Sequence, residues 1–250
     1  MPGGVVTVDK SGSGANGFMT DIVYADLFGN LWEVDPATGG SRYQNGVGAD
    51  VPLFSFETDF HPIGVPPAIF DNGGQQFAVV ASGGYADVTG TLGWGTYAPA
   101  GDPQRIIAVG LNTPNGGVPT VPLTENSSAT FVPVNIPFGA GERSFSQVQV
   151  VGSEFFVTTD TALVNGIGYG TSSSDTGKVY RFNYGTSTAG ATQTTAYGAS
   201  SVANDGTNLY SSSGGKHQRL TSGAAGTTGP AVTAADSVNK MVRKLWLRTE

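Results

Sequence analysis

Hydrophobic and polar residues alternate over short stretches of this chain, and glycine, asparagine, aspartate or serine separates each stretch from the next. Alternation with a period of two places every second side chain on one face of an extended strand. The best helical stretch, residues 231–239, is too short to be stable without tertiary packing. The pattern therefore predicts an all-β fold, with strands at residues 21–25, 30–35, 76–82, 105–111, 145–151, 154–159, 178–183, 208–212 and 241–248.

Two segments far apart in the chain repeat one pattern. FGNLWEVDPATG at residues 28–39 and TGKVYRFNYGTSTAG at 176–190 each have a glycine turn, an alternating strand, an Asp or Asn, and a second turn. DGTNLYSS at 205–212 is a weaker third copy. Repeated small sheets that cannot bury both faces alone are typical of β-propeller blades, of about 40–50 residues each. We expect Trp32 and Tyr180 to fill the space between neighbouring sheets.

Long loops interrupt this repeat in two places. The stretch near residues 91–134 is rich in Gly, Pro, Asn and Thr and contains one convincing strand, and the stretch near 211–230 is rich in Ser, Gly, Ala and Thr. Low-complexity sequence of this kind is typical of loops. We therefore expect residues 1–250 to form one domain, a partial or modified β-propeller with long Gly/Ser/Thr-rich loops.

Composition narrows the function classes. Of the 250 residues 38 are glycine, about twice the usual 7%, and only 12% are charged, about half the usual 25%. These values exclude coiled coils and helix bundles. A net charge of −7 argues against a partner that is nucleic acid. The chain has no cysteine, which excludes disulfides and thiolate metal sites, and no apolar stretch approaches the roughly 18 residues of a membrane helix.

Four segments occur in a recognisable order. They are DIVYADLFGNLWEVD at 21–35; PLFSFETDFHPIGVPP at 52–67 with AVVASGGY at 78–85; GER at 141–143 with FFVTTDT and GKVYRFN after it; and KLWLRTE at the end. In order and spacing they resemble the later half of the C-terminal β-propeller of the type IV pilus tip-associated adhesins, the PilY-type proteins. One position departs from that pattern, because Ala25 replaces the glycine before Asp26 and resists a positive φ.

This resemblance implies a quinoprotein-like propeller and a non-enzymatic function. The chain would be an extracellular bacterial protein at the pilus tip that promotes pilus biogenesis and attachment to surfaces or host cells. Its expected partners are minor pilins, another chain that completes the propeller, and a surface or glycan ligand. Residues 1–14 have neither the basic start nor the apolar run of a signal peptide, so we expect any signal peptide to lie outside this sequence.

The resemblance also implies a calcium loop before residues 21–35. The candidate ligands are Asp9, Ser11, Ser13 and Asp21. Calcium takes six to eight oxygens, and affinity falls as carboxylates are removed. Two serines replace carboxylates here, Lys10 adds a positive charge, and the span is several residues too long. Two alternatives follow: binding is weak or lost, or the site is rebuilt with backbone carbonyls and Asn16. We expect no other cofactor.

Enzymatic chemistry has little support in the sequence. His61 and His217 are the only histidines, and we expect each to be structural or exposed. No Gly-x-Ser-x-Gly elbow lies between a strand and a helix. Residues 30–39 also fit the repeat of quinone-dependent dehydrogenases, so a quinoprotein-like enzyme or scaffold is one alternative. Such enzymes need a full ring of blades and, in many members, a vicinal cysteine pair.

A carbohydrate-binding or adhesive module is the other alternative. Trp94 lies in the sequence GWGTY, where the flanking glycines would leave both faces of the indole accessible to a sugar ring. The same residue could equally pack beneath a long loop. Trp94 is the candidate ligand-binding residue.

Overall fold

The computed structural model describes residues 4–10, 19–57, 61–83, 103–111, 121–139, 142–144, 146–160, 177–184, 192–195, 202–204, 209–213, 216–220 and 232–233. Across these residues every element is a strand or a turn, which confirms the all-β prediction. No helix among them is long and apolar enough to cross a membrane.

The strands form antiparallel sheets of four, each in chain order. The first sheet contains β1 (Val5–Val8), β2 (Asp21–Ala25), β3 (Asn30–Val34) and β4 (Phe54–Ser55). The second contains β5 (Ala68–Asn72), β6 (Gln75–Ala81), β7 (Arg105–Gly110) and β8 (Val134–Pro137). The third contains β9 (Gln149–Val151), β10 (Glu154–Asp160), β11 (Gly177–Asn183) and β12 (Thr192–Thr195). The fourth contains β13 (Ala203–Asn204), β14 (Leu209–Ser213), β15 (Lys216–Leu220) and β16 (Val232–Thr233).

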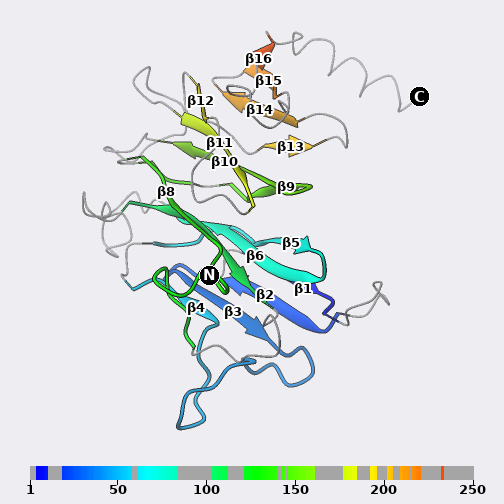
Figure 1. Cartoon of the computed structure of the whole chain (residues 1–250), viewed down its shortest axis with the longest axis vertical. Coiled ribbons are helices and arrows are strands. Elements are labelled where there is room, and N and C mark those ends of the chain that lie inside the picture. Colours follow the sequence, from blue (N-terminus) through cyan, green and yellow to red (C-terminus); the bar gives the residue numbers. More distant parts are fainter. Residues whose placement is uncertain are drawn as a thin grey trace.

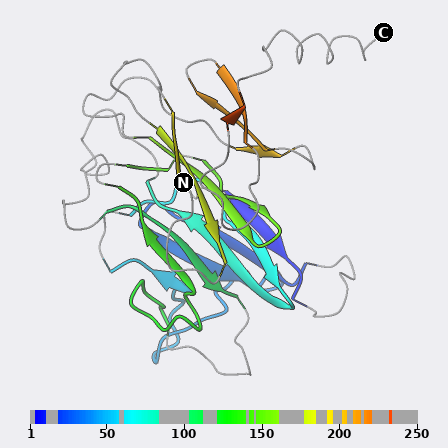
Figure 2. The same cartoon turned by 45° about the horizontal axis from the view of Figure 1, so that its top comes forward.

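Consecutive sheets stack face to face, as Figures 1 and 2 show. The sequence of strand β6, QQFAVVA, explains this stacking. A strand that is buried on both faces needs a continuous apolar run, and β6 has one from Phe77 to Ala81. Ala78 and Val80 pack in the cluster shared with the first sheet. Phe77 and Val79 pack in the cluster shared with the third sheet. The second sheet therefore lies between the first and the third.

The third sheet continues this arrangement. Phe155 and Val157 of β10 face the second sheet together with Phe182 of β11. Phe156, one residue along the same strand, packs instead with Val202, which directly precedes β13. The alternation along β10 thus supplies both neighbours with apolar side chains.

Several sequence predictions need correction. Strand β15 lies inside the 211–230 stretch for which we expected a loop, and β16 lies inside the predicted helical stretch 231–239. The stretch 91–134 holds β7, as expected, and Leu123 also forms a bridge to Phe54. The predicted strand at 145–151 is shorter, since β9 begins at Gln149. The predicted strand at 241–248 lies outside the described residues.

The two aromatic residues expected between sheets behave differently. Tyr180 is buried in the cluster between the second and third sheets, as predicted. Trp32 is only half-buried, on the face of the first sheet that points away from the second. Its ring stacks on Tyr24 of the neighbouring strand, with centroids 6.2 Å apart. The prediction for Trp32 was wrong within the described part of the chain, because no described sheet covers that face.

Candidate functional site

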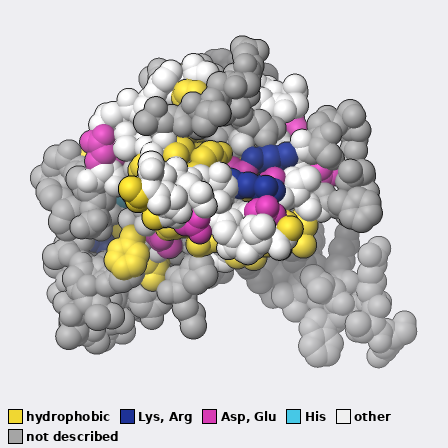
Figure 3. Space-filling view, turned by 90° about the horizontal axis from the view of Figure 1, so that it is seen from below, with side chains coloured by type: hydrophobic (Ala, Val, Ile, Leu, Met, Phe, Trp, Pro, Cys, Tyr) yellow, Lys and Arg dark blue, Asp and Glu magenta, His cyan; other side chains and the backbone are white. Residues whose placement is uncertain are grey.

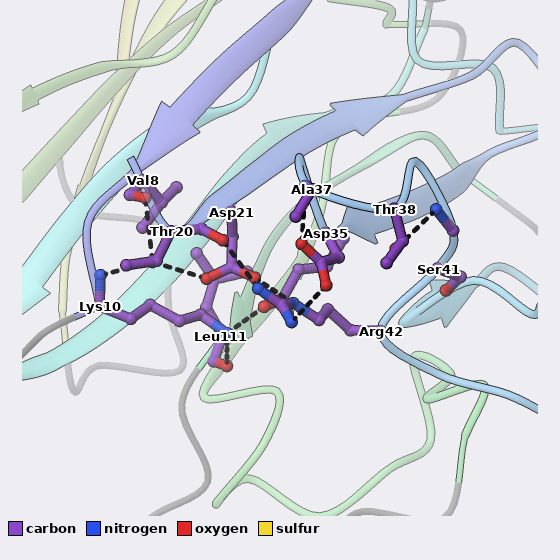
Figure 4. Close-up of polar contacts among 12 residues, drawn as sticks. Val8, Lys10, Thr20, Asp21, Asp35, Ala37, Thr38, Ser41, Arg42 and Leu111 are labelled. Atoms are coloured by element: carbon purple, nitrogen blue, oxygen red, sulfur yellow. Dashed lines mark hydrogen bonds and ion pairs between the residues drawn. The ribbon is translucent and has the colours of Figure 1, made fainter. Parts of the chain in front are cut away.

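Charged side chains gather where β2 begins and β3 ends. Arg42 donates from Nε to Asp21 Oδ1 at 2.5 Å and from Nη2 to the Thr20 carbonyl at 2.8 Å. Its Nη1 lies 3.1 Å from Asp35 Oδ2. Figure 4 shows Arg42 between the two carboxylates, and Figure 3 shows basic and acidic side chains together on the face seen from below. The hydrogen-bonded ion pair with Asp21 raises the pKa of Arg42, so Arg42 keeps its positive charge.

Glu33 is the buried acid of this charge cluster, which comprises Lys10, Thr20, Asp21, Glu33, Asp35, Arg42 and Tyr43. The Glu33 carboxylate is fully buried and pairs with Lys10 Nζ. Tyr43 donates its hydroxyl to Glu33 Oε2 at 3.1 Å. Lys10 Nζ also donates to the carbonyl of Leu111, directly after β7, at 2.8 Å. Lys10 therefore ties the first sheet to the second.

Burial dominates the titration of this acid. Loss of solvation raises the pKa of Glu33, and Lys10 lowers it in part. Burial also raises the pKa of Tyr43, and the nearby Glu33 adds to the effect because a tyrosinate would repel the carboxylate. Tyr43 therefore keeps its proton and acts as a hydrogen-bond donor at all physiological pH values.

Of the four predicted calcium ligands, Asp9 and Asp21 lie within the described residues. Asp21 uses one oxygen for Arg42 and accepts a hydrogen bond from Thr20 Oγ1 on the other at 2.7 Å. The Asp9 carbonyl accepts from Gln76 Nε2 at 3.0 Å. Ser11 and Ser13 lie outside the described residues. Among the residues that are described, no three or more His, Cys, Asp or Glu side chains are arranged to hold a metal. Calcium binding stays a prediction, and a cation at Asp21 would have to compete with Arg42.

A second polar centre organises the turn between β2 and β3. Asp26 Oδ1 accepts the backbone N–H groups of Phe28 and Asn30, at 2.9 and 3.0 Å. Its Oδ2 accepts Asn30 Nδ2 at 3.0 Å and Trp32 Nε1 at 2.9 Å. One carboxylate thus satisfies four donors of a single hairpin. Ala25 continues β2 opposite Leu31, so the departure from glycine is accommodated by regular strand pairing.

Gly29 closes the same turn against the rest of the sheet. Its φ is +80°, and an added Cβ would lie 2.7 Å from the carbonyl oxygen of His61. His61 is itself buried, stacks on Phe56 with ring centroids 4.4 Å apart, and has Nε2 3.1 Å from the Pro103 carbonyl. His61 therefore packs in the core, which confirms the first of the two expectations for it, structural or exposed. The side chain of His217 and the whole of Trp94 lie outside the described residues.

A third polar cluster contains the same residue types as the Glu33 cluster, and its lysine and tyrosine belong to β11 of the third sheet. Glu142, within the GER segment, is buried and pairs with Lys178 Nζ, while Tyr180 donates its hydroxyl to Glu142 Oε2. Thr159 adds a hydrogen bond at 3.2 Å. Burial and the bond to Glu142 raise the pKa of Tyr180. A buried glutamate held by one lysine and one tyrosine therefore occurs twice.

No protein-family model matches this chain, and no curated protein matches its sequence.

Within the described residues, the carboxylates of Asp26, Glu33 and Glu142 all accept hydrogen bonds from groups of the same chain. Buried charges are stabilised by paired, hydrogen-bonded partners, and such arrangements fix loops and sheet ends in place. Sequence reasoning missed Glu33 and Arg42. One signal was available: Glu33 occupies a core-facing position of β3, on the same side as Leu31, where an apolar residue is the norm.

Proposed function

We propose that this chain is a non-enzymatic module of the type IV pilus tip, in which a propeller-type scaffold presents loops to surfaces or host cells. The observation that carries the proposal is the hairpin centred on Asp26. Asp26, Gly29, Asn30 and Trp32 belong to the segment that resembles the PilY-type proteins, and all four take part in one turn. The resemblance therefore involves residues that depend on one another physically.

The sheet order supports the propeller part of the proposal. Four-stranded antiparallel sheets in chain order, of which the first three pack on one another through apolar faces, are the arrangement expected of consecutive blades.

Adhesion requires exposed groups on rigid supports, and two loops provide them. Phe28 is 60% exposed at the turn fixed by Asp26. Val47 is 87% exposed in the segment 45–49, where Asn45 Oδ1 accepts the backbone N–H groups of Val47 and Ala49. Binding residues commonly lie on loops held by a stiff scaffold. Trp94 is a further proposed contact for a glycan.

Fractionation of pili tests the proposal. An epitope tag is added to the chain in the bacterium that encodes it, filaments are sheared from the cells, and the filament fraction is probed. We expect the tagged chain in that fraction and fewer surface filaments when its gene is deleted. A strain that lacks the major pilin is the control. If the chain stays with the cells while filaments are shed, or if the purified chain carries quinone absorbance, the proposal fails.

A further inference from the structure

Two Asn-Gly dipeptides lie within the described residues, Asn45–Gly46 and Asn72–Gly73. At such a dipeptide the backbone nitrogen of the glycine can attack the side-chain amide of the asparagine, and glycine has no side chain to hinder the attack. Both asparagines are exposed. Their surroundings differ, so the fold should give them different rates.

Asn45 begins a turn whose hydrogen bonds converge on its side chain. Its Oδ1 accepts the backbone N–H groups of Val47 at 3.1 Å and of Ala49 at 2.9 Å, and its carbonyl oxygen accepts the N–H of Gly48 at 2.9 Å. The ring closed by the Val47 hydrogen bond contains both Cγ of Asn45 and the nitrogen of Gly46. These are the two atoms that must join, so the turn holds the side chain folded back over the peptide bond that attacks it.

The same two N–H groups face the charge that the reaction creates. When the Gly46 nitrogen attacks Cγ of Asn45, that carbon becomes tetrahedral and negative charge develops on Oδ1. Preorganised N–H donors stabilise such an oxygen, and the loss of one donor from an enzyme's site slows catalysis by about 10²–10³-fold. Among the described residues the N–H of Gly46 has no acceptor, so the attacking nitrogen need not break a hydrogen bond.

Asn72 has neither of these advantages. It is the last residue of β5 and pairs with Gln75 of β6 across a two-residue turn, so ring formation there would distort the end of this ladder. No described residue donates a hydrogen bond to its side chain. By contrast, residues 45–49 contain no strand, and the chain there can follow the reaction without breaking a sheet.

We propose that Asn45 is a self-modification site, at which the fold accelerates the conversion of asparagine to aspartate and isoaspartate. The Gly46 nitrogen bonds to Cγ and loses its proton, and the side-chain nitrogen takes up a proton and leaves as ammonia. One water then opens the five-membered succinimide. Cleavage between Cγ and the Gly46 nitrogen gives aspartate, and cleavage at the main-chain carbonyl gives isoaspartate.

Either product changes an exposed part of the surface. The segment 45–49 has no charged residue, and the reaction adds one negative charge two residues from Val47, which is 87% exposed. Isoaspartate also lengthens the main chain by one methylene group within the turn. Conversion at Asn45 does not depend on the role at the pilus and proceeds whether or not the chain reaches filaments.

Timed incubation of the purified full chain at pH 8 tests the proposal. Peptide mass spectrometry follows the gain of about 1 Da at each asparagine. A parallel incubation in concentrated urea, with unfolding verified by far-ultraviolet circular dichroism, gives the rate of each dipeptide without the fold. In urea the two rates should be similar. In the folded chain Asn45 should convert at least about tenfold faster than Asn72, and faster than it does in urea.

Gly46→Ala is the matched variant. Gly46 has no positive φ and nothing lies within 4 Å of an added Cβ, so the fold should tolerate the change. The methyl group hinders the attack and should slow conversion of Asn45 at least about fivefold, with Asn72 unaffected. Two results would overturn the proposal. The first is conversion of Asn72 as fast as that of Asn45 in the folded chain. The second is slower conversion of Asn45 in the folded chain than in urea, because the hydrogen bonds to Oδ1 would then protect the amide.

Discussion

Asp26 and Trp32 are joined by a hydrogen bond of 2.9 Å from the indole nitrogen to Oδ2, across the turn between β2 and β3. The same carboxylate holds two backbone N–H groups and the side-chain amide of Asn30. Strand, turn and aromatic side chain therefore depend on one acid. Because an Asp satisfies its own turn and reaches the following strand, the hairpin can form from local sequence alone.

Replacement of Asp26 by alanine should destabilise the protein strongly. The change removes the acceptor of four donors at once, and hydrogen bonds to charged groups are worth about 1.5–3 kcal/mol each where they are shielded from water. Since the turn is partly solvated, we expect a loss of about 3 kcal/mol in the free energy of unfolding, measured with urea and far-ultraviolet circular dichroism. Asp71→Ala is the control, because within the described part of the chain Asp71 accepts one hydrogen bond, from the N–H of Gly74 in the turn after β5. It should lose about 1 kcal/mol, and equal losses would contradict the role given to Asp26.

Gly29→Ala should be more damaging than Gly39→Ala. Both glycines have a positive φ, +80° at Gly29 and +74° at Gly39, so each substitution adds backbone strain of about 1 kcal/mol. Only at Gly29 does the new methyl group meet backbone, 2.7 Å from the His61 carbonyl, whereas nothing lies within 4 Å at Gly39. Thermal unfolding should give a melting temperature several degrees lower for Gly29→Ala than for Gly39→Ala. Similar melting temperatures would mean that the turn can move away from His61.

Trp94→Ala tests the carbohydrate-binding alternative. If Trp94 stacks on a sugar ring, its removal should abolish retention on a glycan array and leave the melting temperature within about 1 °C, since an accessible side chain contributes little to stability. Binding that survives the substitution would exclude Trp94 as the contact. A large fall in melting temperature would favour the other sequence interpretation, in which Trp94 packs beneath a loop.

The sequence predicted the central strands well, for a physical reason. Strand β6 is a continuous apolar run, and β2 and β3 alternate cleanly, so their patterns reflect burial directly. Strand β15 reads KHQRL and has no such pattern. It pairs with β14 over five residues, so its extended form comes from its neighbour in the sheet and could not be predicted from local sequence.

The candidate site was predictable only where its parts are close in sequence. Asp26, Asn30 and Trp32 lie within seven residues, and the motif that they form pointed to the hairpin. Lys10 and Glu33 are 23 residues apart, and Arg42 and Asp21 are 21 apart. These pairs depend on the register of β1, β2 and β3, which the alternation alone does not fix. A search for polar residues at core-facing positions would have found Glu33 but not its partners.

Lys10→Met should make stability depend more steeply on pH. Burial raises the pKa of Glu33 above its ordinary value of 4.5, and Lys10 opposes that rise. Without Lys10 the folded-state pKa rises further, while the unfolded-state pKa stays near 4.5. The folded protein then holds a proton that the unfolded chain has released. Stability is therefore fully present below pH 4.5 and is lost as the pH rises through the folded-state pKa.

Urea unfolding of Lys10→Met at pH 5 and pH 8 measures this effect. Removal of one partner of a buried ion pair costs about 3–5 kcal/mol when the other charge is left unpaired. We expect the loss relative to the unaltered chain to be of that order at pH 8 and smaller at pH 5, by about 1.4 kcal/mol for each further unit that the Glu33 pKa rises. The double variant Lys10→Met, Glu33→Gln has no charge at either position, so this pair should contribute nothing to the difference between its own free energies of unfolding at pH 5 and pH 8. A loss for Lys10→Met that is also independent of pH would show that Glu33 stays ionised without Lys10, and that Tyr43 and the sheet ends provide enough solvation for the bare carboxylate.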